Sequence, residues 1–422
     1  MDIHKFFLIA IALLVGGSGC RPPESTTSSG VWADFRGPTQ QGHAGDVDVP
    51  TTWSEAENVR WKTAIRGRGH STPIIWKNQI WLTTATRDGK KLFVICVDRE
   101  SGEVVLEKMI FEVDAPEIID ALNSYASPSA VVEEGRVYVH FGTYGTACLD
   151  TDSFEVVWSR RDLTLDHGRG PGSSPILWQD LLIVNCDGRD VQYVVALDKA
   201  TGQTRWKTPR SIDYSTYDPE HRKAYSTPVV ITVDGQEQLI SPGAQATMGY
   251  EPSTGREIWK MRYKGFSNVS RPVTAADTVF LSTGFEKASL LAVKLGGTED
   301  VTDSHLLWTK SRQIPIVSSM ITVDGMLFMV SDGGIASCYD AQSGEQYWIE
   351  RLGGKFTASP VHVAGRLYFC NVEGRTFVVA AEKDFRLIAE NNLDSAIMAS
   401  PAMVEDAIYI RTETHLYRIE DH

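Results

Sequence analysis

The 422-residue sequence predicts an all-β protein, an eight-bladed β-propeller whose four-stranded antiparallel blades close into one ring. Three observations predict this fold. Runs of Val, Ile, Leu, Tyr and Phe alternate with Gly, Asp and Pro along most of the chain, with almost no helical periodicity. Two short patterns recur along the chain, and the first of them recurs at intervals of 40 to 55 residues, about the length of one blade. The two ends of the chain supply complementary parts of one further repeat.

Each predicted repeat opens with a Ser/Thr-Pro pair or a close variant. The proline of this landmark stands at Pro73, Pro128, Pro175, Pro228, Pro272, Pro360 and Pro401, and Met320 replaces it in the sixth repeat. Inner strands of a propeller crowd around its axis, so the small residues before each proline should pack and hydrogen-bond there. None of these hydroxyls has a His or an acid at a nucleophile's spacing, and we assign them no catalytic role.

A second landmark closes the repeats, an acidic residue followed eight positions later by a large apolar residue. The pairs are Asp98/Leu106, Asp150/Trp158, Asp198/Trp206, Glu251/Trp259 and Asp340/Trp348. Asp can cap a tight turn by accepting backbone N–H bonds, and Gly supplies its positive φ. We expect tryptophans on the outer strands to wedge between blades: Trp61, Trp158, Trp206, Trp259, Trp308 and Trp348. Turns should differ locally at Phe154 and Phe385, which replace the glycine, and at an insertion between Val293 and Trp308.

The ends of the chain predict how the ring closes. The last repeat, residues 396–422, has three strand-like runs and stops where a fourth should begin. The stretch from Asn58 to Ile65 supplies the missing strand, because Trp61 takes the place that tryptophan has in the other outer strands. A ring closed in this way leaves no open seam.

The first residues have the composition of an export signal. An apolar run from Phe6 to Val15 is too short to span a bilayer, and small residues lead from it to Cys20. We predict a lipoprotein-type signal peptide over residues 1–19, lipidation of Cys20, a flexible linker over 20–30 and a single propeller domain over 31–422. Gly17 stands where lipoboxes usually carry Leu, so an ordinary secretory peptide cleaved near Gly19 is the alternative. Both predict an exported protein.

Charge and cysteine usage narrow the classes of function. The net charge of −13 disfavours nucleic acid and anionic membrane surfaces as partners. Beyond Cys20, five cysteines remain, all in apolar, strand-like stretches without C-x-x-C spacing: Cys96, Cys148, Cys186, Cys338 and Cys370. We expect them to be small buried hydrophobic residues rather than metal ligands.

The pattern A-x-D-x-x-T-G-x-x-x-W, present in "ALDKATGQTRW", resembles the repeat of the PQQ-like β-propeller superfamily. Its members include quinoprotein dehydrogenases and the outer-membrane assembly lipoprotein BamB. The resemblance covers roughly residues 58–422 and implies the propeller fold. Because one fold hosts catalysts, scaffolds and binders, the resemblance leaves the function open.

For a catalyst, the resemblance implies a quinone held against a tryptophan and, in soluble alcohol dehydrogenases, a vicinal disulfide and bound calcium. The sequence has no Cys-Cys pair, no C-x-x-C-H haem site and no long insertions for a substrate chamber. We therefore favour the non-catalytic, BamB-like branch: a monomeric scaffold or recognition module, without cofactor or metal, that binds another cell-envelope protein. The lipid on Cys20 would anchor it to a membrane facing the periplasm, the outer membrane by analogy. The alternatives are a dehydrogenase-like oxidoreductase using PQQ and calcium, and a carbohydrate or small-ligand binder.

The residues three positions before each landmark proline should form one mouth of the central channel. His70, Tyr125 and Tyr225 belong to this series, and Arg169 and Arg271 stand near it. Together they would make a polar, partly basic funnel for a small anionic ligand or an acidic peptide tail. The alternative is a solvated channel whose polar groups pair with one another. Three long inter-blade segments would carry binding specificity: Phe111–Ser124, Arg161–Pro171 and Arg210–Lys223.

Overall fold

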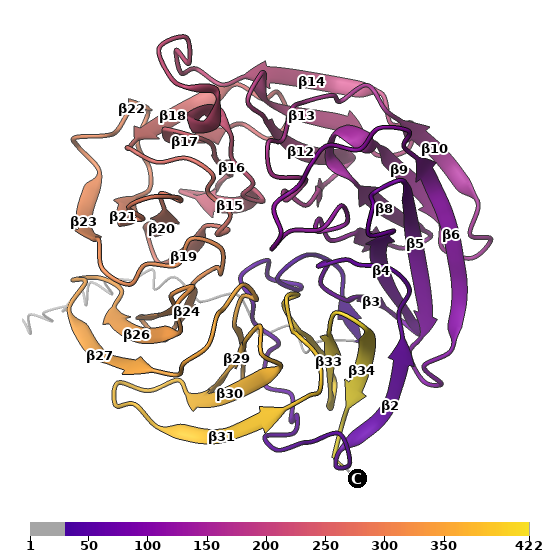
Figure 1. Ribbon diagram of the computed structural model, residues 1–422. Coiled ribbons are helices and arrows are strands. Elements are labelled where there is room, and N and C mark those ends of the chain that lie inside the picture. The colour runs from indigo at the N-terminus through magenta and orange to yellow at the C-terminus, as the bar shows by residue number, and fades with distance from the viewer. Residues whose placement is uncertain (1–29, 422) are drawn as a thin grey trace, which may run out of the picture.

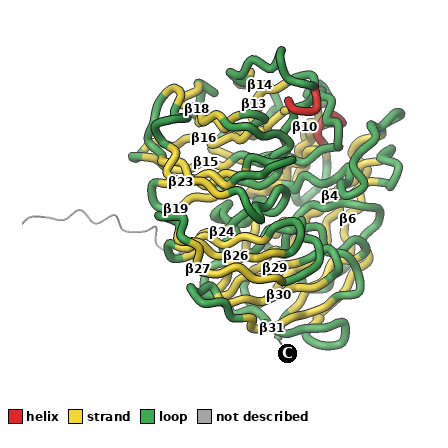
Figure 2. The backbone as a smooth tube through the Cα atoms, turned by 60° about the vertical axis from the view of Figure 1, so that its left-hand side comes forward, coloured by secondary structure: helices red, strands yellow, loops and turns green. Residues whose placement is uncertain are grey.

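The computed structural model describes residues 30–421, and its strands form eight sheets around a central axis (Figure 1). The chain visits the blades in order round the ring, and Figure 2 shows nearly all of it as strand or loop. The predicted all-β, eight-bladed propeller is confirmed. The predicted signal peptide, Cys20 and nearly all of the linker lie outside the described residues.

Each blade has four antiparallel strands, numbered here from the axis outward. Blade one contains β3 (Ile74–Trp76), β4 (Gln79–Ala85), β5 (Lys91–Asp98) and β6 (Val104–Glu112), with β1 (Val31–Trp32) added beside β3. Blade two contains β7 (Val131–Glu133), β8 (Arg136–His140), β9 (Thr146–Asp150) and β10 (Val156–Arg160). Blade three contains β11 (Ile176–Trp178), β12 (Leu181–Asp187), β13 (Gln192–Asp198) and β14 (Thr204–Pro209). Blade four contains β15 (Val229–Val233), β16 (Gln236–Pro242), β17 (Ala246–Tyr250) and β18 (Glu257–Arg262), with β22 (Glu299–Asp300) added outside β18.

The second half of the ring repeats this plan. Blade five contains β19 (Val273–Ala275), β20 (Thr278–Ser282), β21 (Leu290–Lys294) and β23 (Leu306–Lys310). Blade six contains β24 (Ile321–Val323), β25 (Met326–Val330), β26 (Ile335–Asp340) and β27 (Gln346–Arg351). Blade seven contains β28 (Val361–Val363), β29 (Arg366–Cys370), β30 (Arg375–Ala380) and β31 (Leu387–Asn392). Blade eight contains β32 (Ala402–Val404), β33 (Ala407–Arg411), β34 (His415–Ile419) and β2 (Val59–Ala64). Over residues 30–421 the only helices are the 3-10 turns η1 (Gly142–Tyr144) and η2 (Pro219–Arg222).

The acidic residue of the closing landmark caps the turn between the third and fourth strands. Oδ1 of Asp98 accepts hydrogen bonds from two backbone N–H groups of its turn, at 2.8 and 3.1 Å. The same pair of bonds forms in three other blades, at Asp150, Asp198 and Asp340. The turn glycine has positive φ, 74° at Gly102, and Phe154 takes φ of 61° at the equivalent position. The Phe154 turn therefore keeps the glycine conformation, and the local difference expected there is not found.

Outer-strand tryptophans join one blade to the closing turn of the next. The indole Nε1 of Trp158 donates to the carbonyl of Lys199 at 2.9 Å. Equivalent bonds to the next blade are made by Trp61, Trp206, Trp308 and Trp348. A Cβ added to Gly202 would lie 2.6 Å from the Trp158 ring, so glycine is needed there for close approach as well as for its φ of 72°. Trp259 instead bonds Gln238 of its own blade, and β22 from the insertion pairs with β18 outside it.

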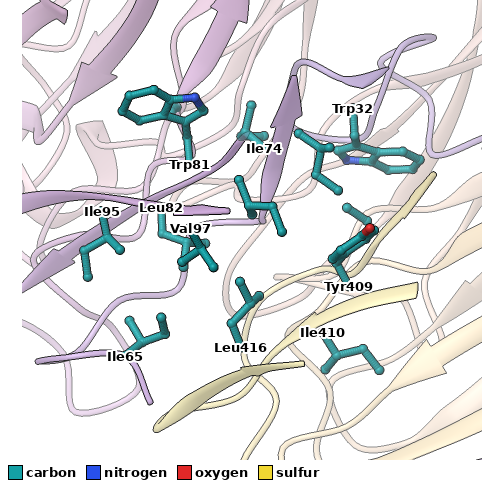
Figure 3. Packing of buried hydrophobic residues seen from close by; sticks show 14 of the residues in the cluster. Trp32, Ile65, Ile74, Trp81, Leu82, Ile95, Val97, Tyr409, Ile410 and Leu416 are labelled. Carbon is teal, nitrogen blue, oxygen red and sulfur yellow. The ribbon is translucent and has the colours of Figure 1, made fainter. Parts of the chain in front are cut away.

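The N-terminal strand closes the ring as predicted. In blade eight β2 pairs antiparallel with β34, which places Trp61 opposite Arg418 and Ala64 opposite His415. Figure 3 shows the core beside this seam, where Trp81 and Leu82 of blade one share a cluster with Leu416 of blade eight. The five cysteines of residues 30–421 are all buried and free, in agreement with their expected role.

Residues 31–50 do not belong to any repeat, and we call them the plug segment. They cross the ring near the axis and bind several blades. In the first half of the ring, β1 pairs with β3 and the Ala33 carbonyl accepts from Val132. In the second half, Asp34 pairs with Arg271, Arg36 donates to the Met320 and Pro360 carbonyls, and Ala44 donates to the His362 carbonyl. Blades one, two, five, six and seven are therefore tied together by one short segment. The core of the ring lies between blades, and the plug segment fills the axis from one end.

Candidate functional site

A cavity of about 550 Å³ lies on the axis of the ring. Its wall is formed by the starts of the inner strands and by the connections that precede them, and Phe35 of the plug segment lies at its floor. The channel is therefore a pocket, filled from one end by the plug segment and lined by inter-blade segments at the other. Its volume falls in the range of small-molecule binding sites.

Two tiers of residues form the wall, with one residue from each blade in each tier. The upper tier consists of His70, Ser127, Gly172, Tyr225, Val269, Val317, Thr357 and Met398, all of which line the cavity. The hydroxyl tier lies two residues further along each strand and consists of Thr72, Ser129, Ser174, Thr227, Ser319, Ser359 and Ser400, with Arg271 in blade five. The upper tier is polar or glycine in blades one to four and mostly apolar in blades five to eight.

The hydroxyl tier links neighbouring blades through hydrogen bonds. The backbone N–H of Thr72 donates to Oγ of Ser129 at 2.9 Å, and five further links of 2.9 to 3.0 Å continue the pattern. Ser129, Ser174, Thr227, Ser359 and Ser400 of this tier also line the cavity. These hydroxyls satisfy backbone donors where strands crowd, and that use explains why small hydroxyl residues recur at the landmark.

Blade two is out of register with the landmark proline. Its inner strand β7 begins at Val131, so the hydroxyl-tier position is Ser129 and the upper-tier position is Ser127. Counting back from Pro128 instead selects Tyr125, which is not among the cavity-lining residues. Tyr125 packs behind the wall, where its hydroxyl donates to the Glu117 carbonyl at 2.6 Å.

All three long inter-blade segments reach the cavity. Asp120, Leu122 and Asn123 come from the first, Arg169 from the second, and Glu220, His221 and Lys223 from the third. The connection between β20 and β21 adds Phe285 and Glu286. Leu122 and Phe285 of this lining are apolar and exposed, by 56% and 54%, and Ile118 of the first segment is exposed by 92%. The rim of the cavity is therefore both charged and apolar.

Charged side chains of the rim pair with one another. The Arg169 guanidinium lies 3.3 Å from the Asp120 carboxylate and 3.8 Å from that of Glu220. Glu220 also binds Lys223, whose side chain is 2% exposed and whose pKa is lowered by burial. On the opposite wall Asp332 accepts two backbone N–H bonds, and burial raises its pKa. With Glu286, the rim carries four acids and two bases, and its ion pairs correspond to the second interpretation of the sequence, a channel whose polar groups pair with one another.

The structure brings three of the five predicted mouth residues together, His70, Arg169 and Tyr225. Burial lowers the pKa of His70 to about 3, and its buried Nε2 has no hydrogen-bond partner among residues 30–421. Arg271 does not reach the mouth, because it is fully buried beside the plug segment, 3.0 Å from the Asp34 carboxylate. The hydroxyl of Tyr225 donates to the His167 carbonyl at 2.7 Å.

Sequence reasoning missed Phe35, Phe266, Phe285 and Asp332 of the lining. Phe35 lies in the non-repeating plug segment, and Phe266 and Phe285 lie in connections of ordinary length, so no pattern distinguishes them. Asp332 follows β25, and an acid in a turn is common in every blade.

The lining does not fit the quinone and calcium site that the resemblance implies for a catalyst. No tryptophan is among the residues that line the cavity. Within residues 30–421, no group of three His, Cys, Asp or Glu side chains is placed to hold a metal ion, and no two cysteines are bonded. We therefore derive no chemistry through such a group.

A closed ring of eight blades with PQQ-like repeats defines this protein as a member of the PQQ-like repeat β-propeller superfamily. The family model described as outer membrane protein assembly factor BamB matches residues 58–230 and 190–421, and the chain belongs to that family. No curated protein sequence matches the chain. None of the helices over residues 30–421 has the length and apolar character needed to cross a membrane.

Solved structures share the fold at low sequence identity. BamB from Moraxella catarrhalis is similar with a TM-score of 0.58 and 12% identity, over 85% of this chain and 98% of that one. A europium-containing methanol dehydrogenase gives a TM-score of 0.66 and 10% identity, over 90% and 89%. The quinohemoprotein alcohol dehydrogenase from Comamonas testosteroni gives 0.62 and 10%, over 93% and 81%. BamB and the two dehydrogenases thus share the fold with this chain, and the function has to be argued from the site.

Proposed function

We propose that this protein is an exported, non-catalytic recognition module that binds another protein of the cell envelope on the face where the axial cavity opens. The observation that carries the proposal is the rim. Ile118, Leu122 and Phe285 are large apolar side chains, more than half exposed, on connections held by a rigid ring. Exposed apolar groups gathered around a polar pocket are a feature of protein-binding surfaces.

The family description supports an envelope role, because it is that of an outer membrane assembly factor. A lipid anchor on Cys20, attachment to the outer membrane and a monomeric state belong to the same proposal.

Site-specific photocrosslinking in the native cell tests the proposal. A photoreactive amino acid placed at Ile118 or Leu122 of the full-length protein should give one reproducible adduct with an exported protein. Matched control positions are Val157 and Ile349, which are exposed by 43% and 42% on the outer strands β10 and β27. The Phe285→Asp substitution should weaken the rim adduct. Equal adducts at rim and control positions, or none at the rim, would contradict the proposal.

An absorbance titration with PQQ and calcium tests the oxidoreductase alternative. The lining offers no tryptophan on which a quinone could stack, so we expect no saturable change in the cofactor spectrum. Stoichiometric binding would replace the recognition proposal with the oxidoreductase.

A further inference from the structure

We propose that the hydroxyl tier at the base of the cavity is a binding site for a single carboxylate group, carried by a ligand with an apolar portion. This inference rests on the proposed function in one respect, because a partner protein could supply the carboxylate from its C-terminus. The site itself rests on the hydrogen bonds and charges around the axis.

Five hydroxyls of the cavity wall have a donor to spare. Ser129, Ser174, Thr227, Ser359 and Ser400 are 2 to 6% exposed, and each accepts a backbone N–H bond from the preceding blade. Across residues 30–421 none of the five donates its own O–H to any acceptor. An O–H group that accepts a hydrogen bond is polarised into a better donor. These five hydroxyls come from blades two, three, four, seven and eight, and each can donate to an acceptor placed in the cavity.

His70 lies beside the hydroxyl tier. It belongs to the upper tier of blade one, and its Nε2 is buried with no hydrogen bond in the part of the chain that the structure describes. Its depressed pKa, about 3, keeps the imidazole neutral at ordinary pH, and a neutral ring can donate from Nε2. Because this nitrogen has almost no accessible surface, it does not contact the cavity, and the site rests on the hydroxyls and on the charges around them.

The charge beneath and beside the hydroxyl tier is positive. Arg36 donates only to the carbonyls of Pro360, Met320 and Gln41, and Met320 and Pro360 directly follow members of the tier. Arg411 donates only to Ser71 and Thr83, and its charge acts on His70.

Neither Arg36 nor Arg411 has a carboxylate among its hydrogen-bond partners. Burial lowers the pKa of each to about 9, which leaves both protonated at neutral pH. The third buried arginine, Arg271, is already paired with Asp34. Two buried cations without a counter-ion favour an anion nearby, because an uncompensated buried charge is costly.

The rest of the cavity selects among anions. Val269, Val317 and Met398 of the upper tier provide one apolar side, while the rim carries the acids Glu286 and Asp332. These acids would repel a phosphate or another polyanion entering from solvent. The carboxylate of a ligand with a single carboxylate and an apolar portion would accept hydrogen bonds from the hydroxyls, and its apolar portion would pack against the apolar side of the cavity. A peptide C-terminus and a free aliphatic acid both have this chemistry.

Calorimetric titration of the full-length protein tests the site with defined probes. One arm uses the peptide acetyl-Ala-Ala-Ala-Ala-Val with a free carboxylate and the same peptide as a C-terminal amide. The second arm uses hexanoate, and the third uses inorganic phosphate. We expect saturable binding of the free peptide or of hexanoate, at least tenfold weaker binding of the amide, and no saturation by phosphate. The tighter of the first two probes identifies the source.

Three substitutions of Met398 separate the effect of charge on binding from the effect of side-chain shape. Met398 is a flexible side chain of the upper tier, similar in length to Lys, Glu and Gln. Met398→Lys should tighten carboxylate binding and Met398→Glu should weaken it, each on the order of tenfold, with Met398→Gln as the neutral control. Circular dichroism melting of each variant checks the fold.

Equal affinity for peptide acid and amide, preference for phosphate, absence of saturation by any carboxylate, or the same change for Lys and Glu would overturn the inference. The rim crosslinks are measured separately, so protein recognition can succeed while the carboxylate site fails, and the reverse.

Discussion

Replacement of Gly202 by Ala tests whether close packing of the indole of one blade against the closing turn of the next contributes to stability. Gly202 has φ of 72°, and its added methyl would lie 2.6 Å from the Trp158 ring. Gly235 is a matched control, because it has φ of 77° and an added methyl meets nothing within 4 Å. The left-handed backbone costs an alanine roughly 1 kcal/mol at either position. Overpacking against the indole adds roughly 2 kcal/mol at Gly202 alone, so Gly202→Ala should lower the free energy of unfolding by about 3 kcal/mol and Gly235→Ala by about 1.

Urea unfolding followed by circular dichroism measures both values. A double-mutant cycle with Trp158→Ala then assigns the excess to its cause. Without the indole, Gly202→Ala should cost no more than Gly235→Ala, which gives a coupling energy of about 2 kcal/mol. The two alanine substitutions could destabilise the wild-type background equally, or the coupling energy could be near zero. Either result would refute a contribution from packing against the indole and leave only the effect of the backbone conformation.

Other contacts give predictions of the same kind. Trp61→Ala removes the bond to Arg99 and the packing of β2, so we expect a loss of about 2 kcal/mol and faster proteolysis at residues 58–65; unchanged cleavage would contradict this. Arg271→Ala leaves the buried Asp34 carboxylate alone and should cost about 3–5 kcal/mol, with Asp34→Ala restoring part of the loss in the double variant measured by thermal unfolding. Burial lowers the pKa of His140 to about 3, below its unfolded value, so the stability that the neutral ring contributes is present above pH 6.5 and is lost as pH falls. At pH 5 the loss is about 2 kcal/mol. His140→Gln should remove that part of the acid sensitivity, and parallel profiles of stability against pH for the two proteins would disprove this prediction.

The repeating parts of the fold could be predicted from the sequence because each repeat restates the same local chemistry. The side chain of Asp98 caps its own turn by accepting from backbone N–H groups two and three residues on. Trp61 matches the other outer-strand tryptophans, so the eighth blade could be assembled from both ends of the chain. The plug segment could not be predicted. Its partners lie in distant blades, and a single copy of Asp34 or Arg36 has no period to reveal it.

Residues of the candidate site could be predicted only in blades where the landmark proline keeps a constant distance from the upper tier. His70 and Tyr225 follow the landmark and line the cavity, whereas Pro128 stands two residues ahead of its expected position in blade two and points to Tyr125 instead of Ser127. Arg271 is the one member of the hydroxyl tier without a hydroxyl. Its reason lies in the plug segment, since its carboxylate partner Asp34 is 237 residues away in the chain.

The closure of the ring also fixes an order of events in folding. Val59 pairs with Ile419, and Arg36 bonds the carbonyl of Pro360 across 324 positions of sequence. Blades one to seven consist of contacts local in sequence, whereas β2 and Arg36, near the start of the propeller, have partners near its end. Until these late residues are available, Trp53 lacks the Tyr368 ring on which it stacks, and β2 with Trp61 lacks its partner strand β34. A chain that is still folding therefore carries an exposed apolar end, and anything that delays its last strand prolongs the interval in which that end can bind a neighbour.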